Sequence, residues 1–184
     1  MSFDNLDNFL IMKIMEFLPL KERILCKNVC HRWASLHELC NQNIISLFLN
    51  ENGLVQNKLN YGYNRLYGDK ILHKILLLTG KKLKKLVIDE CDATVSLTLF
   101  SIIGQLCPKI DHFEIKDASN IVFDNVKDLE PCTYLKSFVA ENAHELEDWQ
   151  LEDLLLTLPN IKKISITDAP YLSGGEFVLE LCKN

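Results

Sequence analysis

Hydrophobic residues recur at two different spacings along the chain, and the change of spacing divides it into two parts. In residues 6–18 the apolar side chains fall mostly three or four positions apart, which predicts a short helix with one apolar stripe. The members of this stripe are Leu6, Phe9, Leu10, Ile14, Phe17 and Leu18. From residue 83 onward the apolar residues instead form short blocks typical of strands.

Two further helices are predicted before residue 43. Leu18-Pro19 ends the first helix, because proline disfavours helical backbone in the residue before it and suits the first turn of a following helix. A second helix is expected over about 20–27. A third should begin near Val29 and end between residues 40 and 43, with Trp33, Leu36 and Leu39 on one face. Asp7 is placed to cap the first helix.

These forty residues carry more apolar surface than they can bury among themselves, because a unit of this size is marginally stable without a partner, a metal or a disulfide. Three blocks carry a resemblance to the F-box. They are Leu6, Leu10 and Ile14, then Leu18-Pro19-Leu20-Lys21-Glu22, then Val29-Cys30-His31-Arg32-Trp33 with Leu36. Asp7 stands where that family usually has proline.

The resemblance implies that residues 1–42 dock onto the Skp subunit of a cullin ubiquitin ligase. The residues it places in this contact are Leu6, Leu10, Ile14, Leu18, Pro19, Val29, Cys30 and Trp33. The alternative for this segment is an ordinary three-helix packing element that binds no partner.

A repeated block follows in the second part of the chain. Segments with apolar residues at their first, fourth and sixth positions start at Leu83, Ile110, Leu135 and Ile161, which are 27, 25 and 26 residues apart. Helices are predicted between and after them, over 97–106, 126–132, 149–158 and 176–182. An irregular unit should precede them, with a strand over 44–49, a helix over 70–78 and a loop carrying Tyr61, Tyr63 and Tyr67.

The period and the helix ends, such as Cys107-Pro108, resemble the cysteine-containing class of leucine-rich repeat found in many F-box adaptors. Cys91 stands where that class has a turn Asn or Cys, whereas Ala118, Ala143 and Ala169 occupy the equivalent positions. The expected fold is α/β: a three-helix F-box, then a short repeat solenoid over 43–184 with parallel strands on its concave face and helices on its convex face. The helix expected over 176–182 would leave the far end without a polar cap.

Residues between the inward apolar positions of each strand should face out from the concave side. This set, expected to bind a protein target, is Lys85, Val87, Asp89, His112, Glu114, Lys116, Ser137, Val139, Glu141, Lys163, Ser165 and Thr167. The first row across the strands, Lys85, His112, Ser137 and Lys163, leans basic. The row at the turns, Glu90, Asp117, Asn142 and Asp168, leans acidic. The alternative is that these charges only keep an exposed sheet soluble.

Charge and composition narrow the function classes. The formal net charge of -5 argues against nonspecific nucleic-acid binding, and no apolar run approaches the length of a membrane span. Acidic residues stand where a secretory signal would carry positive charge, and seven singly scattered cysteines fit reduced thiols. We therefore expect an intracellular protein of the cytoplasm or nucleus, with no nucleic-acid or membrane partner.

Candidate chemistry is sparse. Zinc ligands were sought among Cys26, Cys30, His31, His37 and Cys40, but their spacing does not fit a zinc finger, and Cys26 and Cys30 are better interpreted as core thiols. No nucleophile elbow, phosphate loop or nucleotide fingerprint is present, so we expect no catalytic residue, metal or cofactor.

The sequence thus predicts a non-catalytic substrate-recognition subunit that reaches a cullin and a RING subunit through the Skp subunit and binds an unknown protein target. One alternative is a scaffold or assembly factor that uses its repeats without recruiting ubiquitin ligase activity. A third class, an enzyme with a Cys-His pair, would need two scattered residues to meet across the stack.

Overall fold

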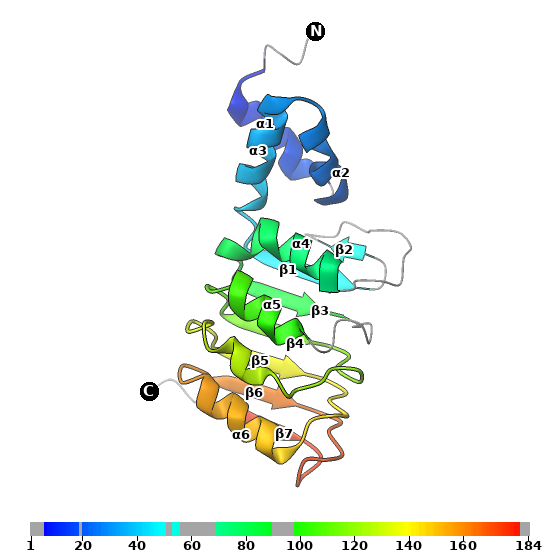
Figure 1. Ribbon diagram of the computed structural model, residues 1–184, viewed down its shortest axis with the longest axis vertical. Helices are drawn as coiled ribbons and strands as arrows, with labels where there is room; N and C mark the ends of the chain where they lie inside the picture. Colours follow the sequence, from blue (N-terminus) through cyan, green and yellow to red (C-terminus); the bar gives the residue numbers. More distant parts are fainter. Residues whose placement is uncertain (1–5, 19, 51–52, 56–68, 90–97, 181–184) are drawn as a thin grey trace.

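The computed structural model describes residues 6–18, 20–50, 53–55, 69–89 and 98–180. The chain is a mixed α/β protein in which a helical module stands at one end of a seven-stranded, mostly parallel sheet (Figure 1). The helical module consists of α1 (Asn8–Phe17), α2 (Leu20–Leu25), the short 3₁₀ helix η2 (Cys26–Asn28) and α3 (His31–Asn41).

Local signals set the ends of these helices much as the sequence predicts. The Asp7 side chain caps α1, with its Oδ1 accepting a hydrogen bond from the Leu10 N–H at 2.8 Å. Leu18, which precedes proline, is extended with ψ of 144° and ends α1. Helix α3 begins two positions later than Val29, because Cys30 is extended and serves as its N-cap residue.

The sheet has the order β2-β1-β3-β4-β5-β6-β7. Its strands are β1 (Ser46–Asn50), β2 (Gly53–Val55), β3 (Lys85–Ile88), β4 (His112–Ile115), β5 (Ser137–Ala140), β6 (Lys163–Ile166) and β7 (Phe177–Glu180). The five central strands are parallel neighbours, and the strand at each end is antiparallel. The segments between parallel strands are α4 (Asp69–Thr79), η3 (Gly80–Lys82), α5 (Leu99–Leu106), η5 (Val126–Leu129) and α6 (Asp148–Thr157).

The helices α4, α5 and α6 lie on one face of the sheet (Figure 1). The apolar positions of the four repeated blocks point to that face, and all twelve are buried. They also pair in register, so that Leu86, Phe113, Phe138 and Ile164 form a continuous row across four strands. The predicted strand positions and their inward faces are therefore confirmed.

One predicted helix is wrong. The segment expected to be helical over 176–182 contains β7, which pairs antiparallel with β6. Phe177 and Leu179 pack partly against the sheet core while Val178 between them is exposed, which is the two-residue alternation of a strand. Gly175 turns the chain just before it with φ of +73°, a conformation that suits glycine. The far end of the sheet is thus covered by an antiparallel strand.

Other differences from the sequence prediction are small. The stretch over 126–132 forms only the single 3₁₀ turn η5, and β2 was not predicted, although Asn52-Gly53 is a hairpin signal. Helix α4 confirms the helix expected over 70–78. The loop tyrosines and Cys91 lie outside the described residues.

Two hydrophobic clusters hold the chain. The smaller lies within the helical module and contains Ile11, Met15, Cys26, Leu36 and Cys40. The larger begins at Ile44 and runs through the sheet to Leu172, and Ile24 of α2 packs against it. The helical module therefore contacts the sheet domain at its N-terminal end, through α2 with β2 and α3 with α4.

Consecutive units approach closely at a glycine. A Cβ added to Gly104 of α5 would lie 1.9 Å from the carbonyl oxygen of Asp128 in η5. Only glycine, which has no Cβ, allows the backbones of α5 and η5 to come this close. Phe100 on the same helix packs against Phe123, with 5.6 Å between the ring centroids.

This contact predicts that Gly104→Ala destabilises the protein, because a methyl group at this position forces the two units apart. We expect a loss of about 1–3 kcal/mol in the free energy of unfolding, as overpacked sites generally show. Denaturant unfolding followed by circular dichroism measures it. Gly174→Ala is the control, because its added Cβ would make an ordinary contact at 3.5 Å. Equal stability of the two variants would contradict the close packing.

Candidate protein-binding surfaces

Helix α1 has two apolar faces with different roles. Ile11 and Met15, one helical turn apart, are fully buried and form the centre of the module's core. A neighbouring face of the helix carries Leu10, Ile14 and Phe17, of which Phe17 is 82% exposed. The apolar stripe identified in the sequence is therefore largely uncovered, and the inner face was missed because Ile11 and Met15 interleave with it.

Exposed apolar side chains on the neighbouring helical elements extend this surface. Besides Leu39 near the end of α3, the exposed large apolar residues described in the helical module are Phe9, Leu10, Ile14, Phe17, Leu25 and Val29. We call these six the outer apolar surface. Monomeric proteins seldom expose so many large apolar side chains together, and such surfaces mark interaction sites.

The residues predicted to contact a Skp subunit divide into two groups. Leu10, Ile14, Val29 and Cys30 are exposed. Leu6, Leu18 and Trp33 are partly buried and pack against the module's core, so they support the surface as well as border it. Pro19 lies outside the described residues. Cys30, expected in the core, is exposed, because it is the extended N-cap residue of α3.

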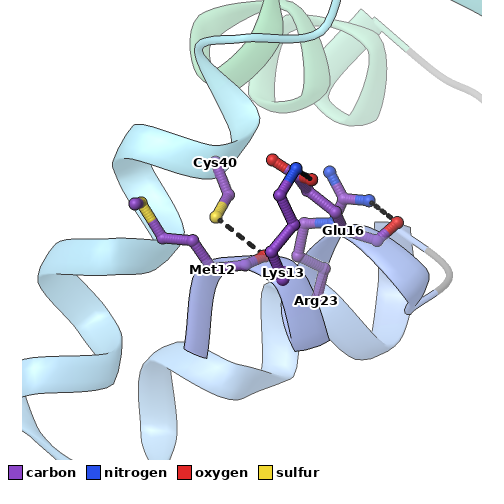
Figure 2. A network of polar contacts seen from close by, with 5 residues as sticks. All are labelled: Met12, Lys13, Glu16, Arg23 and Cys40. Carbon is purple, nitrogen blue, oxygen red and sulfur yellow. Dashed lines mark hydrogen bonds and ion pairs between the residues drawn. The ribbon is translucent and has the colours of Figure 1, made fainter. Parts of the chain in front are cut away.

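Polar contacts hold the three helices together (Figure 2). Arg23 of α2 is buried and donates hydrogen bonds to the carbonyl oxygens of Glu16 and Leu18, at 3.0 and 3.3 Å. These carbonyls belong to the C-terminal end of α1, where backbone acceptors lack helical partners and a positive charge is favoured. Lys13 forms an ion pair with Glu16 at 2.7 Å, and the Cys40 thiol of α3 donates to the Met12 carbonyl at 3.7 Å.

A second tie joins the start of α1 to α3. Arg32 donates from Nε to the Asn8 Oδ1 at 2.8 Å and also to the carbonyl oxygen of Leu6. None of these polar contacts uses an outer apolar side chain. The helices therefore keep their arrangement through contacts that leave the outer apolar surface free.

Two buried polar residues lie on the inner side of α3. His37 and Asn41 are one turn apart, and the His37 Nε2 and both side-chain polar atoms of Asn41 have no hydrogen-bond partner among the described residues. Burial lowers the pKa of His37 below its ordinary value, and the positive charge of Lys27 lowers it further. The imidazole is therefore neutral in the folded protein near pH 7.

Because the pKa of His37 is lower in the folded chain than in the unfolded chain, the unfolded state takes up the proton first as the pH falls. Stability should decrease as the pH is lowered through about 6.5, the ordinary pKa of histidine. We expect the melting temperature to fall between about pH 7.5 and pH 5.5, and to fall less in a His37→Gln variant. His73→Gln, at an exposed position on α4, is the control. Equal pH dependence of all three proteins would exclude His37 as the source.

The second surface is the face of the sheet opposite the helices, which we call the outward face. Most of the residues predicted there are partly or fully exposed; these are Lys85, Asp89, His112, Glu114, Lys116, Ser137, Val139, Glu141, Lys163, Ser165 and Thr167. Val87 is an exception, because it is fully buried. Its register neighbours are Phe48 and Glu114, and the short valine is recessed between these longer side chains.

Charged residues of the outward face interact with each other. His112 Nε2 lies 3.1 Å from Glu114 Oε2, and Lys116 Nζ lies 3.5 Å from Asp89 Oδ2. The Lys85 ammonium stands 5.6 Å from the centre of the Phe48 ring. Phe48 is 38% exposed and was not among the predicted surface residues, although it occupies an outward position of the strand predicted over 44–49.

Four of the five described cysteines are buried. Burial raises the pKa values of Cys107 and Cys132 to about 12, so these thiols stay protonated. The described residues contain no group of three His, Cys, Asp or Glu side chains that could hold a metal ion. Within the same ranges no helix is both long and apolar enough to cross a membrane. Ala118, Ala143 and Ala169, which follow their strands at the turn positions equivalent to Cys91, are fully buried.

Comparison with protein families gives one result for the helical module. A family model of the F-box domain matches residues 3–36. The match covers α1, α2, η2 and the first half of α3, and it includes all six residues of the outer apolar surface. No curated protein matches the chain. The chain thus contains an F-box domain, and F-box domains bind the Skp subunit of SCF-type ubiquitin ligase complexes.

Proposed function

We propose that this protein is a non-catalytic substrate adaptor of an SCF-type ubiquitin ligase. In this role the F-box docks onto the Skp subunit, which joins it to a cullin and a RING subunit, while the sheet domain binds a protein target. Ubiquitin transfer is carried out by the other subunits. The complex would act in the cytoplasm or the nucleus.

The outer apolar surface is the observation that carries the proposal. It lies within the F-box match and remains uncovered although the helices already hold each other through Ile11, Met15 and the polar contacts of Arg23. Leaving large apolar side chains in water is unfavourable by roughly 25 cal/mol for each Å² that a partner could cover. A helical partner with a complementary groove would bury them.

The sheet domain supports the second half of the proposal. Its parallel strands recur about every 26 residues, with one helix or 3₁₀ turn between most neighbours on the same face. We interpret these units as leucine-rich repeats. Arrays of this kind present an extended face to other proteins, and the outward face is the corresponding surface here.

Changing either of two exposed members of the outer apolar surface should weaken Skp binding. Leu10→Glu and Val29→Glu each place a charge where an apolar contact is expected, and both side chains are exposed, so the fold should persist. We expect each variant to lose at least about tenfold in affinity for a purified Skp subunit, measured by isothermal titration calorimetry.

Leu156→Glu is the matched control, because Leu156 is 81% exposed but lies on α6, far from the F-box along the chain. It should bind the Skp subunit like the unchanged protein. Retained binding by Leu10→Glu and Val29→Glu would refute the proposed dock.

A second function is a scaffold that binds the Skp subunit without recruiting ligase activity. Asp7, which replaces the usual proline and caps α1, is the specific observation behind it, because this position opens the F-box. Reconstitution with Skp, cullin and RING subunits decides between the two. A complex of this chain with the Skp subunit that does not take up the cullin would favour the scaffold. Ubiquitination of a protein bound to the chain would favour the adaptor.

A further inference from the structure

Positive charge gathers at one edge of the sheet. The described residues 80–85, 107–112, 133–137 and 159–163 lead into β3, β4, β5 and β6, and because these strands are parallel, all four segments reach the same edge. We call this edge the basic edge. The four segments contain eight lysines and a single acidic residue, Asp111, and Glu180 of β7 is the register partner of Lys163 at one end of this edge. The lysines are Lys81, Lys82, Lys84, Lys85, Lys109, Lys136, Lys162 and Lys163.

Backbone hydrogen bonds place these lysines in register. The Lys84 carbonyl accepts from the N–H of Asp111, the Asp111 carbonyl from Lys136, and the Lys136 carbonyl from Lys162, at 2.8 to 2.9 Å. Lys84, Asp111, Lys136 and Lys162 therefore stand in one row across four strands. Lys136 and Lys162 are one strand separation of about 4.8 Å apart, and Asp111 lies between Lys84 and Lys136. The sheet fixes the backbone positions of this row.

The lysines of this row are exposed and free of ion pairs with described residues. Lys84, Lys136, Lys162 and the adjacent Lys163 are all exposed, whereas the lysine ion pairs found among the described residues involve Lys13, Lys116 and Lys127. Lys136, Lys162 and Lys163 are adjacent like charges with no acidic residue between them, and binding an anionic group would relieve their mutual repulsion.

The opposite edge of the same sheet has the opposite charge. Asp89, Asp117, Glu141 and Asp168 follow the strands there, accompanied by Lys116, which is paired with Asp89. Each strand is four residues long, so the two edges lie about 13 Å apart. This exceeds the Debye length of about 8 Å at physiological ionic strength, so the basic edge attracts anions despite the acidic edge and a net charge of -5.

We propose that the basic edge binds an extended, acidic segment of a partner protein, lying across the strands β3 to β6. This inference rests on the proposed function in one respect: the acidic segment is taken to belong to the protein target of the adaptor. Four strands span about 14 Å, which about five extended residues would cover, so a short run of Asp and Glu is sufficient.

A narrow peptide fits this edge better than a nucleic acid does. A polyanion wider than the basic edge would extend toward the acidic edge and be repelled there. The basic edge contains one exposed aromatic residue, Tyr134, whereas single-stranded nucleic acids are usually bound by several stacking side chains. Its cations are all lysines, which act as point charges and suit carboxylates without a fixed geometry.

The test is fluorescence anisotropy with the full chain and a labelled peptide of roughly ten residues, alternating Glu and Ser, beside a peptide in which Gln replaces Glu. We expect the Glu peptide to bind, the Gln peptide not to bind, and binding to weaken as salt rises from about 50 to 500 mM. The double variant Lys136→Glu, Lys162→Glu should reduce affinity by about tenfold or more.

The control is Lys74→Glu with Lys127→Glu, which changes the net charge equally at exposed positions away from the basic edge. It should retain most of the peptide affinity. Equal loss in both double variants, or binding of the Gln peptide, would overturn the proposal, as would tighter binding of a single-stranded RNA that Lys136→Glu, Lys162→Glu abolishes. Skp binding measured on the same preparations tests the proposed function separately, because the basic edge lies outside residues 3–36.

Discussion

The register of the parallel strands is the constraint on which the rest of this structure depends. Pairing of β3, β4, β5 and β6 without offset places the large inward residues Leu86, Phe113, Phe138 and Ile164 in one row. The same register places outward residues in rows on the other face. A shift of one residue in any strand would expose its apolar positions, so the buried row fixes the arrangement of the exposed charges.

The sheet domain and the helical module differ in how completely they bury their apolar side chains. The sheet domain has a continuous core, with antiparallel strands closing both ends and helices over one face. The helical module has a small core of its own and leaves apolar side chains such as Phe17 and Val29 in water. Cys40 belongs to the small core and Ile44 to the large one, so the change occurs within a few residues. The sheet domain therefore buries its apolar residues within itself, whereas the helical module leaves an apolar surface that a partner can cover.

Much of this arrangement could be predicted from the sequence, because strong local signals agreed with the tertiary structure. The spacing of the four blocks gave the central strands, and Leu18-Pro19 and Asp7 gave the limits of α1. The failures have physical causes. The segment containing β7 was assigned to a helix because seven residues are too few to separate the two periodicities, and its pairing with β6 decides the outcome.

The candidate surfaces were predicted less completely than the fold. Exposure of Leu10 and Ile14 followed from the stripe, but the separate inner face of Ile11 and Met15 did not, because both faces of α1 are apolar. Burial of Val87 depends on the size of its neighbours in adjacent strands, which only the register reveals. The basic edge likewise emerges when distant segments are aligned, since Lys84, Lys136 and Lys162 are far apart in the sequence.

The polar ties of Arg23 and Arg32 have a further consequence for association. Because they fix α1 against α2 and α3 without using the outer side chains, the F-box backbone is already ordered before any partner arrives. Binding then restricts mainly rotamers at the surface, at about 0.5–1.5 kcal/mol for each immobilised side chain, and not the backbone of a folding segment. Encounter can therefore proceed as rigid-body docking, and mutations on this surface should alter the lifetime of the complex more than its rate of formation.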